Sequence, residues 1–335
     1  MNISEIARRA NVSTATVSRT LNQSGPVKAA TARKVWRAVT ELNYVPNGHA
    51  RALVSGRSRM LGVIVSDITN PFFPELLRSF ELRAAEKQYD LLVTSTGYET
   101  ARMSACLRRM LERKVDGVAM MTSEMDLGLI KELSSRGVPM VFMDVGQIGP
   151  KMSHVAVDYG NGVRQAVDHV VELGHKHIAF ISGPLDLHSA RTRRQAFLEA
   201  MRAHGLTTDK KMIREGMHTA DGGHEAMAAL LRLSKKPTAV VCSNDWTAIG
   251  ALNAIVSSGL RVPHDISLVG FDDIPLVTYT NPPLTSVRMS AADVGTVAFQ
   301  ALFGLIGGER VEGAVYQIPT QLVVRESTAK PRKKP

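Results

Sequence analysis

From Met60 onward, short apolar runs alternate along the chain with longer stretches of helical periodicity. Apolar strands separated by helices are typical of parallel sheets that helices cover on both faces. These units are too many for one sheet, so we predict an α/β fold whose body has two doubly wound parallel-sheet lobes. Ligands of such sheets bind beyond the carboxyl ends of the strands, which places a cleft between the lobes. The expected strands are 61–66, 90–95, 117–121, 139–143, 177–182, 239–243 and 266–270, and the expected helices are about 73–88, 100–113, 127–136, 160–173, 189–204, 221–233, 245–258 and 290–305.

Residues 4–22 predict a helix-turn-helix, with two short helices joined at Asn11, a residue that tolerates the left-handed conformation. Ser4 and Ser13 are the expected N-caps, because a hydroxyl can accept a hydrogen bond from a free N–H of the first turn. A third helix is expected at about 31–42. Such a unit can place its second helix in the DNA major groove, and a generic helical hairpin is the alternative from these residues alone. The expected shared core is Ile6, Val12, Val17, Leu21, Val35 and Val39.

The net charge of +10 is concentrated near the N-terminus. Residues 1–59 contain ten Lys and Arg against two Glu, and four basic residues lie at 330–334, which leaves 27 basic and 29 acidic residues elsewhere. A basic N-terminal region on a near-neutral body is typical of a protein that binds nucleic-acid phosphates with one end. We expect the tail, residues 329–335, to be a disordered basic extension, with an auxiliary DNA contact as the alternative.

Length and composition restrict the class of protein. A chain of 335 residues suits a small N-terminal domain and a two-lobed body, and a hydrophobic content of 44% supports a full globular core. The polar N-terminus is unlike a signal peptide, and no apolar run reaches the ~18–20 residues of a membrane span. Cys106 and Cys242 form neither a disulfide framework nor a metal cluster and are expected to be buried. We therefore expect a cytoplasmic, nucleoid-associated protein.

Residues 46–59 form a bridge between the basic N-terminal region and the body. Pro46 ends the third helix, and residues 49–54 are long enough for about one and a half helical turns. So short a helix forms in water only when it is packed, for example against a second copy of itself on DNA. The apolar Leu53 and Val54 favour such a hinge helix, and a flexible linker is the alternative.

The order and spacing of several motifs resemble the LacI family, the lactose-repressor-like bacterial transcription regulators. The resemblance spans about residues 2–328 and includes the N-terminal helices. The further motifs are Leu-Asn-Tyr-Val-Pro-Asn (42–47), Ala-Arg-Ala-Leu (50–53), Asp-Ile-Thr-Asn-Pro-Phe-Phe (67–73), Lys-Val-Asp-Gly (114–117), Leu-Gly-His (173–175), Ser-Ala-Arg-Thr-Arg (189–193), Ser-Asn-Asp (243–245), Val-Gly-Phe-Asp-Asp (269–273), Pro-Pro-Leu-Thr (282–285) and Val-Val-Arg-Glu-Ser (323–327). The expected domains are a helix-turn-helix domain at 1–45, a hinge at 46–59, an effector-binding and dimerisation domain at 60–328 (lobe 1 about 60–156 and 290–318, lobe 2 about 157–289 and 319–328) and the tail.

The resemblance implies a homodimer that binds a pseudo-palindromic double-stranded operator. The second helix of each N-terminal domain would lie in the major groove. By position, Thr14, Ala15 and Arg19 are expected at base edges, where Arg19 can bond a guanine through two hydrogen bonds. Leu53 matches the leucine that wedges into the central minor groove and kinks the duplex. The residues expected on phosphates or behind the helix are Ser13, Thr16 and Asn22.

The resemblance also implies that a small polar effector binds at the strand ends of the body. The principal candidates are Ser189, Arg193, Asn244 and Asp272, and the further candidates are Phe72, Phe73, Asp144, Asp158, His218 and Met289. A guanidinium, a carboxylate and an amide can together bond adjacent hydroxyls in opposite senses, and aromatic faces suit a ring. Taken alone, Arg193 could be a surface residue and Asp272 a loop cap. Relatives often carry a large aromatic residue where this chain has His218, which favours a sugar or sugar derivative over a purine.

Effector binding would change how the lobes sit and so bring the two hinge helices together or separate them. The sequence leaves open whether the effector releases the operator or promotes its binding, and release, the commoner pattern among relatives, is the expectation. Because the tail lacks a leucine heptad, we expect a dimer and no tetramer.

Two other classes of protein share features with this sequence. A periplasmic solute-binding protein has the same two-lobed body, but the basic N-terminal region and the absent export signal argue against it. A sugar-modifying enzyme is the second alternative. Residues 160–165 only approach a dinucleotide fingerprint, and His175 and His177 lack further ligands at metal spacing. Asp272 and Asp273 should diverge in direction, unlike a catalytic pair. No catalytic residue, cofactor or metal is therefore expected.

Overall fold

The computed structural model describes residues 2–22, 25–44, 57–122, 127–144, 148–308 and 312–332. The chain divides into two compact units, which are here called the N-terminal unit (residues 1–58) and the body (residues 59–335). The predicted hinge helix at 49–54 and its Leu53 lie outside the described residues.

Three helices form the N-terminal unit: α1 (Ile3–Ala10), α2 (Thr14–Asn22) and α3 (Ala29–Glu41). Ile6, Val17 and Val35 are fully buried at its centre, and the other predicted core residues pack around them. Asn11 is left-handed, with φ at 55°, as expected at the turn. The prediction that Ser4 caps α1 is wrong, because the helix begins one residue earlier and the Asn2 side chain accepts the bond from Glu5 N–H at 3.1 Å.

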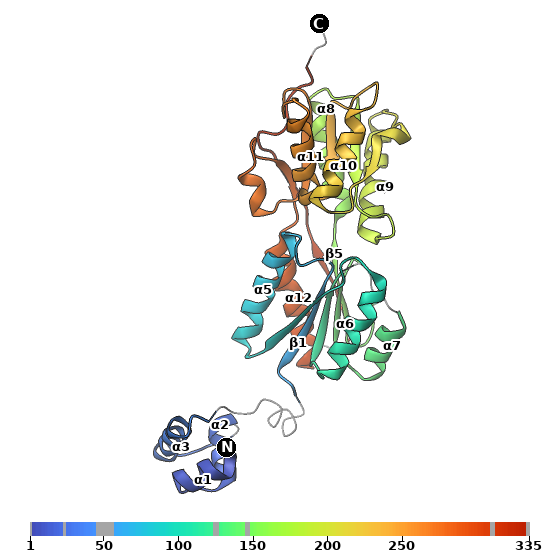
Figure 1. The fold of residues 1–335 in the computed structure, drawn as a ribbon. Helices are drawn as coiled ribbons and strands as arrows, with labels where there is room; N and C mark the ends of the chain where they lie inside the picture. The colour runs from blue at the N-terminus through green and yellow to red at the C-terminus, as the bar shows by residue number, and fades with distance from the viewer. Residues whose placement is uncertain are drawn as a thin grey trace. The chain divides into compact units, whose positions relative to one another are not determined.

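The body contains two six-stranded sheets, each the centre of one lobe (Figure 1). In the first lobe all strand pairs are parallel, and in the second only β12 runs antiparallel to its neighbour β10. The first sheet has the order β11 (Val315–Ile318), β5 (Met152–Val157), β4 (Met140–Met143), β3 (Gly117–Met121), β1 (Met60–Val65) and β2 (Asp90–Ser95). The second has the order β12 (Gln321–Val323), β10 (Thr285–Arg288), β9 (Ser267–Asp272), β8 (Ala239–Cys242), β6 (Ile178–Ser182) and β7 (Ile213–Glu215). The predicted α/β class is confirmed.

Helices cover both faces of the first sheet. Val63 belongs to the apolar cluster under α5 and α12, whereas its neighbour Ile64 belongs to the cluster under α6 and α7, as the alternation of a strand requires. The first-lobe helices are α5 (Phe72–Glu86), α6 (Thr100–Glu112), α7 (Leu127–Ser135) and α12 (Ala291–Ile306). The second-lobe helices are α8 (Tyr159–Glu172), α9 (His188–Ala203), α10 (Ala220–Leu231) and α11 (Asp245–Ser257), with the short 3₁₀ helices η1 (Lys210–Met212) and η2 (Pro275–Thr278).

The chain passes between the two sheets three times. It crosses after β5, after β10 and after β11, so that α12 and β11 return to the first lobe before β12 ends in the second. The strands that sequence analysis did not find are β5, β7, β10, β11 and β12. Three of these are edge strands, which are not enclosed on both sides and therefore need no continuous apolar run.

The start of the tail is ordered, contrary to the prediction of a disordered extension from residue 329. Ala329 N–H donates to Ser267 Oγ at 3.0 Å, and the buried His175 contacts the Ala329 carbonyl through Nε2 at 2.8 Å. Arg332 pairs with Asp265 at 3.4 Å. The chain is thus held against the second lobe as far as residue 332.

The two predicted buried cysteines, Cys106 and Cys242, are both buried and free. Among the described residues, no helix combines the length and the apolar character that a membrane span requires.

Glycines let α10 and α11 approach closely. A Cβ on Gly250 would overlap the Ala220 carbonyl oxygen of α10, and a Cβ on Gly223 would overlap the Thr247 carbonyl oxygen of α11. In each case the obstacle is main chain, which cannot rotate away. The two helices therefore pack with their backbones in contact at these positions.

We expect Gly250→Ala to lower the free energy of unfolding by ~1–3 kcal/mol, because the two helices must separate to admit the methyl group. Gly304→Ala is the matched control, since that helix position has no atom within 4 Å of the new Cβ and Ala favours a helix by ~1 kcal/mol over Gly. Urea unfolding of both variants measures the difference. Equal stability of the two variants would contradict the close packing.

Candidate functional site

The exposed face of α2 carries the residues predicted to read DNA. Thr14, Ala15 and Arg19 are exposed, whereas Val17 on the opposite face is buried. The prediction that Ser13 caps α2 is confirmed, because its Oγ accepts from Thr16 N–H at 3.2 Å.

The Ser13 and Thr16 hydroxyls also bond each other at 2.9 Å, so both groups fix the start of α2. The side chain of Asn22, like Leu53, lies outside the described residues.

In the body, one pocket gathers all but one of the predicted effector residues. Its cavity volume is about 50 Å³, or about 440 Å³ when all the space between the lining atoms and the open mouth is counted. Asp158 does not line it, because its carboxylate instead accepts from Asn161 N–H at 3.0 Å and caps α8. The predicted residues that line the pocket are Phe72, Phe73, Asp144, Ser189, Arg193, His218, Asn244, Asp272 and Met289, and the additional ones are Ser66, Asn70, Tyr98, Thr122, Met143, Leu187 and Tyr159.

Both sheets deliver side chains to the pocket from the carboxyl ends of their strands. From the first lobe, Ser66 follows β1 and Asp144 follows β4. From the second lobe, Asn244 follows β8 and Asp272 ends β9. Parallel strands end on the same edge of a sheet, so residues far apart in sequence converge there. The pocket is therefore formed jointly by the two lobes.

Arg193 extends from α9 and is only 4% exposed. Its guanidinium carbon lies 4.2 Å from the ring centre of Tyr159 and 4.5 Å from that of Phe271, so two aromatic faces bracket the charge. Its Nη2 is 3.7 Å from Asp272 Oδ1. The surface position that sequence reasoning left open for Arg193 is thus wrong, since the side chain is enclosed and held in one orientation.

Asp272 is a buried carboxyl group with an unusual backbone. Its φ is 109°, a conformation that L-residues rarely adopt. Burial, with a smaller contribution from the nearby Asp144, raises the pKa of Asp272 to about 7 against the opposing effect of the Arg193 charge. Asp273 diverges as predicted, because its carboxylate pairs with Arg288 at 2.8 Å and Arg325 at 2.6 Å.

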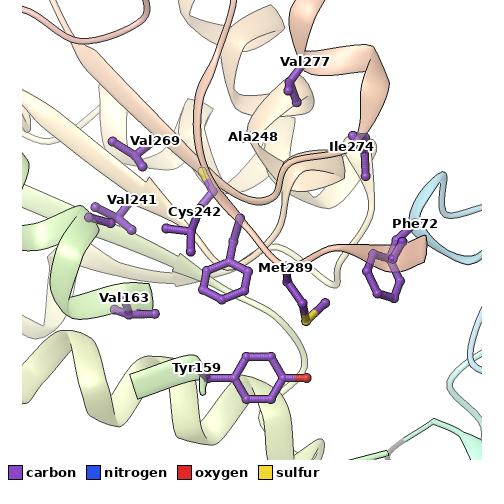
Figure 2. Packing of buried hydrophobic residues seen from close by; sticks show 14 of the residues in the cluster. Phe72, Tyr159, Val163, Val241, Cys242, Ala248, Val269, Ile274, Val277 and Met289 are labelled. Atoms are coloured by element: carbon purple, nitrogen blue, oxygen red, sulfur yellow. The ribbon is translucent and has the colours of Figure 1, made fainter. Parts of the chain in front are cut away.

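Tyr159 connects the two lobes beside the pocket. Its hydroxyl, at the start of α8, donates to the Asp144 carboxylate at 2.7 Å. Burial and the negative charge of Asp144 raise the pKa of Tyr159 well above its ordinary value, so the phenol stays protonated and remains a donor. Figure 2 shows Tyr159, Met289 and Phe72 among the buried apolar side chains of the body.

The Asn244 side chain forms hydrogen bonds within the second lobe. Its Oδ1 accepts from Thr247 N–H at 3.0 Å and caps α11, and its Nδ2 donates to the His218 carbonyl at 3.4 Å. The amide therefore holds the start of α11 and the turn at His218. His218 is itself buried, and burial together with the Arg193 charge lowers its pKa to about 3.

Sequence reasoning missed several lining residues that the strand-end rule could have found. Ser66 and Thr122 follow β1 and β3 directly, and their hydroxyls bond each other at 2.8 Å. Tyr159 follows β5, a strand that was not predicted. Asn70 precedes the predicted aromatic pair, and its Oδ1 accepts from Phe72 N–H at 3.1 Å, which fixes the start of α5.

Comparison with known proteins identifies both parts of the chain. Residues 2–47 match bacterial regulatory proteins of the lacI family, and residues 167–328 match the periplasmic binding protein-like domain. The HTH-type transcriptional repressor PurR of Aliivibrio salmonicida (strain LFI1238) is 33% identical over 329 residues, which is 98% of this chain and 99% of PurR. The chain belongs to the LacI family.

Two solved structures of transcription regulators resemble nearly the whole chain. The lac repressor dimer bound to operator and the anti-inducer ONPF has a TM-score of 0.87 and 30% identity, with 98% of this chain and 99% of that chain covered. The complex of the transcriptional regulator CelR with cellobiose has a TM-score of 0.72 and 31% identity, over the same shares of each chain. The chain is thus a DNA-binding transcriptional repressor, and the relatives reported above are transcription regulators.

The raised pKa of Asp272 makes stability depend on pH. In the folded chain the carboxyl keeps its proton up to about pH 7, whereas in the unfolded chain it releases the proton near its ordinary pKa of 3.8. The free energy of unfolding therefore falls as the pH rises from about 4 to about 7, by ~4 kcal/mol from this group.

Asp272→Asn should remove that loss, because the amide does not ionise. We expect the melting temperature of the variant to fall less than that of the wild type between pH 5 and pH 8, as measured by thermal unfolding. The exposed Asp90→Asn variant should follow the wild type. If the melting temperatures of the wild type and Asp272→Asn differ by the same amount at pH 5 and at pH 8, the protonated carboxyl is contradicted.

Proposed function

We propose that the chain is a homodimeric repressor whose affinity for a pseudo-palindromic operator is controlled by a small polar effector, a sugar or sugar derivative, bound between the lobes. The observation that carries this proposal is the convergence of both sheets on one pocket that contains Arg193 and Asp272. A ligand that touches both lobes binds their alternative arrangements unequally, and unequal binding is what couples a ligand to a distant site.

The chemistry of the pocket supports a sugar. The guanidinium of Arg193 donates hydrogen bonds, and the carboxyl of Asp272 can donate or accept them. The hydroxyl groups of a sugar can do both, so they can bond either side chain. Phe72 and Phe73 meet edge to face, with their ring centres 5.4 Å apart, and supply an apolar surface for a ring. The relative CelR was solved with cellobiose, which is consistent with such a ligand in a body of this fold.

A dimer is supported by the relatives and by the surface of the body. The lac repressor structure that resembles this chain is a dimer. On the body, Tyr279 is 85% exposed and the neighbouring Leu276 is 44% exposed, so both side chains are available to pack against a second copy. Residues 46–59 join each body to its N-terminal unit, and we propose that their spacing in the dimer carries the effector signal to DNA, with release as the default response.

Arg193→Ala tests the pocket. The variant should bind operator as the wild type does, because the N-terminal unit is unchanged, and should lose the response to the effector. Fluorescence anisotropy on an operator selected from random duplexes, with and without a panel of sugars, measures both properties. Arg136→Ala, in the turn directly after α7, removes a guanidinium that pairs with Glu132 at the surface and is a control that should keep the response. A full response in Arg193→Ala would remove this residue from the effector site.

Arg19→Ala tests the DNA contact. Arg19 is exposed on α2, and loss of a two-bond contact to guanine should weaken binding to the selected operator by ~1–3 kcal/mol, with a smaller effect on random DNA. The exposed Lys34→Ala on α3 is the control, and any loss there should be similar for both kinds of DNA. Equal losses on operator and random DNA for Arg19→Ala would show that Arg19 contacts only phosphates.

A further inference from the structure

The segments at the amino end of the second sheet carry a concentration of positive charge. They lead into β6, β7, β8 and β9 or form the tail, and are here called the basic edge: residues 173–177, 204–212, 232–238, 258–266 and 329–335. The basic edge contains eleven Lys and Arg against two Asp, whereas the rest of residues 60–328 contains 20 Lys and Arg against 27 Asp and Glu. Charges that served only solubility would be interspersed with acidic residues. Here they gather on one edge of an otherwise acidic body.

The basic edge lies apart from the effector pocket. The pocket is at the carboxyl ends of β8 and β9, so the segments at the amino ends of the same strands lie at the opposite end of the second lobe (Figure 1). The tail belongs to this end, because Ala329 N–H donates to Ser267 Oγ at the first residue of β9. Small ligands of parallel sheets bind at the carboxyl ends of the strands, so this edge is outside the usual ligand crevice of the fold.

Three lysines of the basic edge surround a hollow of about 430 Å³. Lys176, Lys211 and Lys235 are exposed, and none of them forms an ion pair with a carboxylate of the described residues. Asp209, the one acidic residue in the described lining, accepts from Lys211 N–H at 2.9 Å and caps η1. Like charges held close together repel one another, and a bound anion would relieve that repulsion.

The composition of the basic edge indicates the kind of anion. Eight of its eleven basic residues are Lys, and two of its three Arg, Arg261 and Arg332, pair with Asp265 at 3.4 Å. Lys is a point charge on a flexible stem, which suits phosphate groups in no fixed orientation. The five segments contain no Phe, Tyr or Trp, the residues on which single-stranded bases stack and which anchor many protein interfaces. This chemistry fits the phosphates of a duplex, bound without regard to sequence.

The extent of the basic edge favours a polymer over a small anion. The strands β7, β6, β8 and β9 are neighbours in the sheet, so the starts of the four strands span ~15 Å at a spacing of ~4.8 Å. Double-stranded DNA carries one negative charge per ~1.7 Å of its axis, so a surface of this width meets several phosphates at once. The chain is a DNA-binding repressor, and a body tethered to one bound duplex meets nearby DNA at a high effective concentration.

We propose that the basic edge is a second DNA-binding surface, which holds the phosphate backbone of a duplex other than the operator. Lys176, Lys211 and Lys235 contact the backbone at the hollow, and the tail adds further positive charge. A repressor with this surface bridges its operator to another segment of DNA. The proposal does not depend on the identity of the effector or on its site.

A bridging assay with the full chain tests this surface. Beads carry a duplex of random sequence, and the chain is added with an excess of a short fluorescent duplex that contains the selected operator, so that the N-terminal units are occupied. Fluorescence on the beads then measures chains that hold both duplexes. The wild type should retain the operator duplex on the beads. The triple variant Lys176→Gln, Lys211→Gln and Lys235→Gln should bind operator normally but lose retention by ~tenfold or more at 50 mM salt.

The matched control removes the same charge from the first lobe. Arg113→Gln, Lys114→Gln and Lys131→Gln change three exposed basic residues outside the basic edge, and this variant should retain the operator duplex as the wild type does. Retention by the wild type should also fall about fortyfold between 50 and 200 mM salt for every three phosphates contacted, while the operator stays saturating.

Three results would overturn the proposal. They are no retention by the wild type, equal retention by the triple variant and its control, and retention that salt leaves unchanged. Calorimetric titration with tripolyphosphate separates the main alternative. If tripolyphosphate binds the wild type and not the triple variant, and the beads retain no operator duplex, the hollow is a site for a small anion and the second DNA-binding surface is refuted.

Discussion

The guanidinium of Arg193 is a positive charge enclosed between two aromatic rings and beside one carboxyl group. A charge in such a place is costly unless its surroundings compensate it, because water no longer solvates it. Here the ring faces of Tyr159 and Phe271 supply negative electrostatic potential, and Asp272 supplies charge when ionised. The same contacts fix the side chain in one orientation, so little conformational freedom is lost when a ligand binds to it.

This arrangement also affects the groups around it. The Arg193 charge opposes protonation of His218 and favours ionisation of Asp272, although burial outweighs it at the carboxyl. Asp144 and Asp272 both have positive φ, with values of 66° and 109°. Non-glycine residues persist in such conformations only where the surrounding structure holds them, and they concentrate at ligand-binding sites. Backbone geometry and electrostatics thus single out the same pocket.

Most of the fold followed from the sequence because the central strands are apolar on both faces. β3, with all five residues buried, was predicted at its observed bounds. In contrast, β7 is a three-residue edge strand of Ile, Arg and Glu, and no periodicity marks so short and polar a segment. The tail was predicted to be disordered on its charge, but the contacts that hold it depend on His175 and Ser267, which are distant in sequence.

The sequence predicted those residues of the candidate site that are polar or aromatic and follow a predicted strand. Residues after the predicted strands β4, β6, β8 and β9 lie in the pocket, and Tyr159 was missed because β5 was missed. Asp158 shows the limit of that rule, since a carboxyl group near a strand end can cap a helix instead. The burial of the site residues, and the protonation states that follow from it, depend on packing among many elements. A local sequence pattern does not reveal such packing.

The contact between Gly183 and the His218 ring joins two positions that the sequence separates by 35 residues. Any side chain at 183 would displace the ring, whereas a small residue at 218 would leave a hollow above the glycine. A substitution at one of the two positions therefore changes the space available to the other. A larger residue at 183 will be accommodated only together with a smaller one at 218.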